Sequence, residues 1–205
     1  MAKRHAERAR DPNLRRLIAV EAARIMAEQG VRDFHLAKLK AQERLHAADE
    51  RDLPGNAEID QALREHQALF QSDRQPALLA QRRRAALEAM EFFARFEPRL
   101  VGAVLDGSAD EHSAVCLHLH VDDLREVLEF VASHRIDAEE ETRRLRLDRE
   151  RSAEVPVFLF EAGGTPIDLT VLPYDALRQA PLSRIDGEPI KRAGRAAVER
   201  LLAAG

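Results

Sequence analysis

The residues that could do chemistry gather in one short stretch beyond the middle of the chain. Four polar side chains alternate with apolar ones there: Cys116, His118, His120 and Asp122. Because successive side chains of a strand point to opposite faces, we expect these four on one face and the apolar residues against the core. Imidazole and carboxylate groups that share a face could bind a metal ion, to which Cys116 would add a thiolate. The alternative is the solvated polar face of a one-sided sheet.

Two other segments complete this candidate site. Asp106-Gly107-Ser108 directly follows an expected strand, and Asp106 is expected to cap the turn rather than to bind a ligand. The expected strand 166–171 carries Asp168 and Thr170 opposite an apolar face.

The order of these segments resembles the nucleotidyltransferase superfamily of the DNA polymerase β type, over about residues 99–172. In that family, a Gly-Ser turn opens a short helix that holds nucleotide phosphates. An Asp-x-Asp strand and a later acid then bind two Mg²⁺ ions. The resemblance implies that Gly107 and Ser108 hold phosphate, that His118 and His120 stand at the two aspartate positions, and that Asp168 is the catalytic third acid.

The two histidines depart from the family pattern. Mg²⁺ prefers anionic oxygen ligands, and replacing two carboxylates by imidazoles removes two negative charges. We therefore expect either lost chemistry or a softer metal such as Zn²⁺ or Mn²⁺, held by His118, His120, Asp168 and Asp122. The expected cofactor is thus a divalent metal (Mg, Mn or Zn), and the expected small-molecule partner is a nucleoside triphosphate.

A basic stretch follows within residues 143–151. With Leu145 and Leu147 facing inward, Arg144 and Arg146 share the outward face, where they could contact nucleotide phosphate. The alternative is a solvated edge strand, because acidic residues surround the stretch.

The elements that must position these residues change in character near Pro98. Residues 1–97 predict four amphipathic helices: from Asp11-Pro12 to Gly30, from Asp33 to Ala48, from Asn56, and from Ser72-Asp73. In the fourth, Arg82-Arg83-Arg84 is expected on the solvent side. We expect domains at 1–97 (helical) and 98–205 (α/β).

The second half predicts strands near 100–105, 114–121, 142–149, 155–161 and 166–172, with helices after Asp123 and over 189–204. The expected fold class is α+β: an N-terminal helical region, then a nucleotidyltransferase-like mixed β-sheet with flanking helices.

Two other functions remain open. Residues 18–45 resemble the first helices of tetracycline-repressor-type regulators, in which Lys38, Lys40 and Arg44 would lie against DNA, but a recognition helix is not evident before Leu53-Pro54. Nucleic acid is therefore the lesser expectation. The other function is a non-catalytic interaction module. The apolar faces of the N-terminal helices would need a partner to cover them, which favours a homodimer.

Composition narrows the protein class. The 205 residues carry a net charge of −4, so the molecule as a whole does not have the positive potential that would attract a polyanion. The single cysteine excludes an internal disulfide framework. No apolar run reaches about 18 residues, and no apolar segment follows the basic start, so we expect a cytoplasmic protein with no membrane partner.

Overall fold

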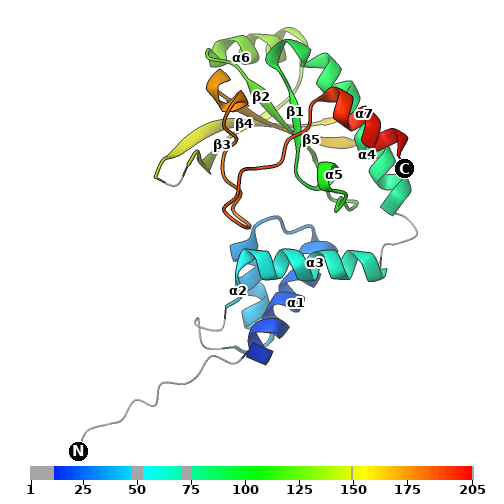
Figure 1. Ribbon diagram of the computed structural model, residues 1–205, viewed down its shortest axis with the longest axis vertical. Helices are drawn as coiled ribbons and strands as arrows, with labels where there is room; N and C mark the ends of the chain where they lie inside the picture. The colour runs from blue at the N-terminus through cyan, green and yellow to red at the C-terminus, as the bar shows by residue number, and fades with distance from the viewer. Residues whose placement is uncertain (1–11, 48–52, 71–74, 149, 205) are drawn as a thin grey trace, which may run out of the picture. The chain divides into compact units, whose positions relative to one another are not determined.

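The computed structural model describes residues 12–47, 53–70, 75–148 and 150–204 (Figure 1). It has an α+β fold with a five-stranded mixed sheet, as the sequence predicts. The chain divides into two compact units, Met1–Phe70 and Gln71–Gly205. The expected caps Asp11 and Ser72-Asp73 lie outside the described residues.

The described part of the first unit contains the helices α1 (Pro12–Gln29), α2 (Phe34–Arg44) and α3 (Asn56–Phe70). Asp33 caps α2 by accepting a hydrogen bond from the Leu36 amide. Gly30 ends the first helix with a φ of 65°, which suits glycine. Small residues on α1 and α2 allow close helix packing around buried Ile18, Ile25 and Ile59.

The unit boundary lies about one helix earlier than the change of pattern near Pro98. Helix α4 (Gln75–Phe92) belongs to the second unit because its apolar side packs on the sheet. Ala86, Met90 and Phe93 join the same core cluster as strand residues such as Leu117. The helical pattern of 75–96 correctly indicated a helix, but it could not indicate which core the helix joins.

The sheet belongs wholly to the second unit. Its strands are β1 (Arg99–Val101), β2 (Val115–His120), β3 (Glu139–Arg146), β4 (Ser152–Ala162) and β5 (Thr165–Leu172). Their order across the sheet is β1-β2-β5-β4-β3. Only β2 and β5 run parallel, and the other neighbours are antiparallel. The turn Gly163-Gly164, with positive φ at both residues, joins β4 to β5 as the sequence predicts.

The remaining helices are α5 (Ala103–Asp106), α6 (Leu124–Ser133) and α7 (Arg195–Ala203), with short 3₁₀ turns η2 (Ala94–Phe96) and η3 (Tyr174–Leu177). The expected strand 100–105 is wrong in its second half, because Gly102 (φ 72°, ψ −153°) breaks it and α5 follows. The expected helix 189–204 begins late, since residues 189–193 run extended and Ala193 pairs with Leu100.

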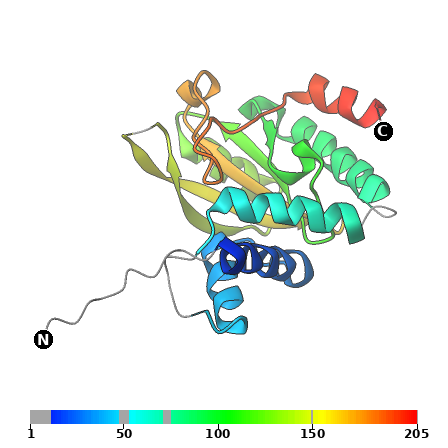
Figure 2. The ribbon, with the colours of Figure 1, turned by 60° about the horizontal axis from the view of Figure 1, so that its bottom comes forward.

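Different segments of the chain pack on the two faces of the sheet. One face carries the main core, where Leu117, Leu169 and Phe158 pack with residues of α4 and α6. The opposite face is met by the connection between β5 and α7 (residues 173–194), whose Ala176 packs on Leu172. Figure 2 shows this connection in orange and red beside the sheet. No helix in the described part of the chain is long and apolar enough to cross a bilayer.

Candidate functional site

The polar residues expected on one face of β2 and β5 do share that face. We call this group the histidine–arginine cluster; it comprises His118, His120, Arg143, Asp168, Thr170 and Arg192. Register places His118 opposite Thr170 and Cys116 opposite Asp168 on the parallel neighbour. The apolar residues between them face the main core, which confirms the predicted alternation.

Asp168 is engaged by an arginine rather than by a metal-binding neighbour. Arg143 reaches it with two nitrogens, at 3.1 Å (Nη1 to Oδ1) and 2.8 Å (Nη2 to Oδ2). Nη1 also donates to Thr170 Oγ1 at 3.2 Å. This forked contact binds the carboxylate through both oxygens and neutralises its charge.

Both histidines are buried, so the expectation of a solvated polar face is wrong for them. Their exposed fractions are 5% for His118 and 0% for His120. Burial lowers the pKa of His118 to about 3, helped by the neighbouring His120, Arg192 and Arg143. Burial also lowers the pKa of His120. Both imidazoles are therefore uncharged at neutral pH.

The tautomer of His120 follows from its partner. Its Nδ1 lies 2.8 Å from the carbonyl oxygen of Glu97, which can only accept, so Nδ1 carries the proton. Nε2 of this neutral ring is then unprotonated and can only accept a hydrogen bond. This Nε2 and His118 Nδ1 are buried and have no hydrogen-bond partner among the described residues.

The donor set does not suit a divalent cation. Two guanidinium groups, those of Arg143 and Arg192, raise the positive potential at His118, and the one carboxylate of the cluster is already paired. Asp122 lies past the end of β2, where its Oδ1 accepts from the Tyr174 amide at 3.1 Å. In the described ranges, no group of three or more His, Cys, Asp or Glu side chains is placed to hold a metal.

Gly107 and Ser108 do not have the position expected of a phosphate turn. They follow α5 instead of opening it, and Gly107 is its C-terminal cap with a φ of 88°. A helix C-terminus presents carbonyl groups, which repel an anion. Asp106 holds this turn as expected, accepting from the Ser108 amide at 2.9 Å and from its hydroxyl at 2.6 Å.

Arg144 and Arg146 are not near that turn either. They lie on β3 at one edge of the sheet, whereas α5 directly follows β1 at the other edge. Four strand spacings separate the two edges, about 19 Å. The structure therefore does not bring the four expected nucleotide-binding residues together. Both arginines are exposed, in agreement with the edge-strand alternative.

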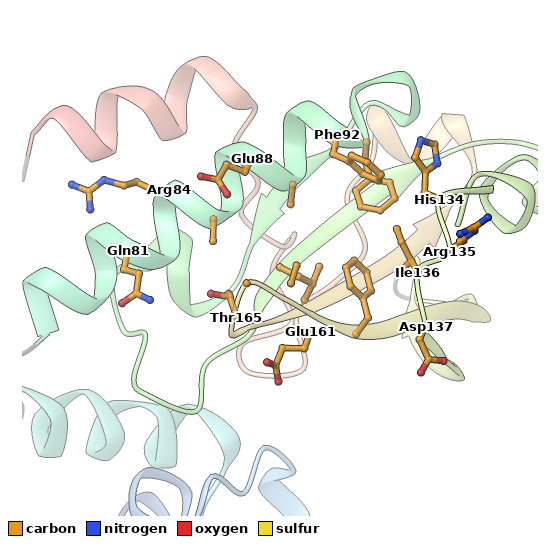
Figure 3. Close-up of a pocket in the computed structure, with 17 residues that line it drawn as sticks. Gln81, Arg84, Glu88, Phe92, His134, Arg135, Ile136, Asp137, Glu161 and Thr165 are labelled. Carbon is orange, nitrogen blue, oxygen red and sulfur yellow. The ribbon is translucent and has the colours of Figure 1, made fainter. Parts of the chain in front are cut away.

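A cleft of about 850 Å³ opens elsewhere in the second unit (Figure 3). Its walls are one side of α4, the loop between α6 and β3, and the β4–β5 hairpin. The apolar lining is Ala85, Ala89, Phe92, Phe93, Ile136, Phe160, Ala162 and Ile167. Arg84 and Gln81 lie toward one end, and Arg135 and Asp137 toward the other (Figure 3). Its volume falls in the range of small-molecule sites.

Sequence analysis missed two features. Arg192 enters the cluster from the connection before α7, where it donates to the carbonyls of Ala176 and Leu177; no local pattern indicates this. The cleft was also missed, although Ala85, Ala89 and Phe92 recur at helical spacing on α4 and Phe93 directly follows its end. That spacing could have signalled a stripe of small and aromatic residues, but not that the stripe stays open.

The arginine run on α4 was also misassigned. Arg82 and Arg83 are buried, and only Arg84 is exposed. Arg83 donates to the carbonyl of Leu201 at 3.0 Å and to that of Val104 at 3.4 Å. It thereby joins α4 to α7 and α5.

The basic residues proposed to face DNA in the first unit are largely engaged within it. Lys38 donates to Asn56 Oδ1 at 2.8 Å, and burial lowers its pKa. Arg44 forms an ion pair with Glu21 at 2.9 Å. Two of the three cations are thus held by protein groups.

No family model and no curated protein matches this chain. The nucleotidyltransferase resemblance consequently rests on the order of strands and motifs alone.

Proposed function

We propose that residues 71–205 form a nucleotidyltransferase-like domain that has lost metal-dependent transfer and acts by binding a ligand. The observation that carries this proposal is the Arg143–Asp168 ion pair beside two buried, uncharged histidines. Two-metal phosphoryl transfer requires a cluster of free anionic oxygens. Here Asp168, the candidate third acid, is neutralised by Arg143. His118 and His120, which stand at the two aspartate positions of the family pattern, carry no negative charge.

The cleft beside α4 is the ligand site in this proposal. Its middle is lined by phenylalanine and aliphatic side chains, which suit a flat apolar group such as a nucleobase. Arg84 and Arg135 make no ion pair among the described residues, so their guanidinium groups could meet phosphate at either end. Nucleoside triphosphates are therefore the first ligands to test, bound without a metal.

Calorimetry on the full chain tests both parts of the proposal. The four ribonucleoside triphosphates are titrated with EDTA and then with Mg²⁺, Mn²⁺ or Zn²⁺, and product formation is followed in the same samples. We expect binding that does not depend on metal, and no nucleotide turnover. Metal-dependent turnover that Asp168→Asn abolishes would contradict the loss of chemistry.

A matched pair of substitutions locates the site. Ala89→Trp fills the cleft and is expected to weaken binding at least about tenfold. Ala77→Trp adds the same side chain on an exposed part of α4 outside the lining and should leave the affinity unchanged. Equal affinities for both variants, or no binding by the parent, would exclude the cleft as a nucleotide site.

A further inference from the structure

Strand β3 forms an edge of the sheet, and part of its outer side is open. It pairs with β4 over residues 139–146, and among the described residues Leu182 alone forms a backbone bridge on its other side, to Arg146. Such an edge presents unpaired backbone groups to another strand.

The alternation of an antiparallel ladder shows which backbone groups point outward. Leu147 bonds inward to Arg151 at 2.9 Å, whereas the Arg146 carbonyl accepts from Leu182 at 2.7 Å on the outer side. Residues in register with Arg146, namely Glu140, Thr142 and Arg144, therefore direct their amide and carbonyl groups outward. The contact of the Arg184 guanidinium with the Arg144 carbonyl agrees with this assignment.

The side chains of β3 divide by charge. Glu139, Glu140 and Glu141 occupy its first half, and Arg143, Arg144 and Arg146 its second half. Glu140, Glu141 and Arg144 are exposed, and Arg143 is about one-third exposed. A strand with opposite charges in its two halves is complementary to an antiparallel copy of itself.

We propose that two copies of this chain associate through antiparallel pairing of their β3 strands, which joins two five-stranded sheets into one. The two-fold axis passes through Thr142. Glu140 then lies opposite Arg144 of the second copy, and this pair is repeated by symmetry. Glu141 lies opposite Arg143, whose guanidinium is already bound to Asp168, so the Glu140–Arg144 pairs carry the charge complementarity. A centre at Glu141 or at Arg143 sets Glu140 or Arg144 opposite Thr142, so both Glu140–Arg144 pairs are lost.

The backbone supports this register. Hydrogen-bonded pairs at Thr142–Thr142 and, twice, at Glu140–Arg144 supply about six backbone hydrogen bonds. The Arg144 carbonyl already accepts from Arg184, but a carbonyl oxygen has two lone pairs and can accept a second bond. Leu182 occupies the outer side of Arg146, so the new ladder ends at that point.

Sedimentation velocity on the full chain over a wide concentration range tests the proposal. The parent is expected to show a concentration-dependent monomer–dimer equilibrium. Glu140→Arg places arginine opposite Arg144, and Arg144→Glu places glutamate opposite Glu140. Each single substitution should weaken the dimer by about tenfold or more. Both side chains are exposed, and circular dichroism checks that the variants stay folded.

Charge exchange makes the test specific to this register. The double variant E140R/R144E restores opposite charges and should recover the parent dimer. An equimolar mixture of the two single variants should form a heterodimer, because each arginine then faces a glutamate. The proposal is overturned if the parent stays monomeric at the highest concentration, or if a parent dimer is indifferent to the single substitutions. If the single substitutions weaken the dimer but neither the double variant nor the mixture recovers it, the proposed register is overturned.

Discussion

Arg143 and Asp168 form a two-pronged ion pair although their strands are not neighbours in the sheet. Strand β4 runs between β3 and β5, and the arginine side chain crosses it to reach the carboxylate at 2.8 Å. The valines of β4 that lie beneath this crossing, Val155 and Val157, are buried. The ion pair thus links the edge strand to the centre of the sheet and occupies the carboxylate that the sequence had predicted as a metal ligand.

Removing one partner of this ion pair is expected to destabilise the second unit. Asp168→Asn leaves the guanidinium without its counter-charge, at a cost of about 1–3 kcal/mol in the free energy of unfolding. Partial exposure of Arg143 keeps the cost below that of a fully buried pair. Urea unfolding of Asp168→Asn, Arg143→Met and the double variant measures the coupling. Strictly additive effects would show that the contact contributes nothing.

Buried His118 predicts that stability falls as the pH is lowered. Its pKa is about 3 in the folded protein, whereas an unfolded histidine titrates near 6.5. Between these values the unfolded state binds the proton, so stability decreases from pH 6.5 toward pH 3. Between pH 7.5 and 5.5, this one residue accounts for about 1.4 kcal/mol. His120, whose pKa is also lowered, adds in the same direction.

Chemical unfolding at several pH values in this window checks that prediction. His118→Leu should show a shallower loss of stability with acid than the parent. Thr170→Val is the matched control, because it changes the neighbouring buried polar residue without removing a titratable group. The same pH slope in His118→Leu and the parent would mean that His118 already takes up its proton in the folded state.

The backbone at Gly102 predicts a contrast between two glycines. Gly102 adopts φ 72° and ψ −153°, a region essentially confined to glycine, and an added Cβ meets nothing within 4 Å. Gly102→Ala is therefore expected to cost about 1–3 kcal/mol through the backbone alone. Gly194, the N-cap of α7, has φ −79° and an equally open surrounding, so alanine there should cost less, only the loss of a better N-cap. Comparable melting temperatures for the two variants would contradict the assigned conformation.

Two adjacent arginines on α4 offer a fourth test. Arg83→Met removes hydrogen bonds to the carbonyls of Leu201 and Val104 and leaves these acceptors without their partner, at a cost of about 1–3 kcal/mol. Arg84→Met, at an exposed position, should change the free energy of unfolding by less than about 0.5 kcal/mol. Thermal unfolding of the two variants compares them directly. Similar losses at both positions would argue against the buried role of Arg83.

The sequence by itself determined most of the local structure. Helical spacing indicated α1 to α4, and alternation indicated β2 and β5 and put His118 and His120 on the opposite face from Leu117 and Leu119. These predictions succeed because side-chain periodicity depends only on the backbone conformation of the segment itself. The turn at Gly163-Gly164 was predictable for the same reason, since positive φ favours glycine locally.

The tertiary structure decided what those elements do. Alternation separates two faces of a strand but does not say what covers each, so the sequence could not show that residues 173–194 contribute Arg192 beside His118. Strand order placed Arg144 and Gly107 at opposite edges, and it brought Arg143 to Asp168 across 25 positions of sequence. Charge pairing and burial between distant segments depend on this order, and they determine whether a polar face binds a metal or neutralises itself.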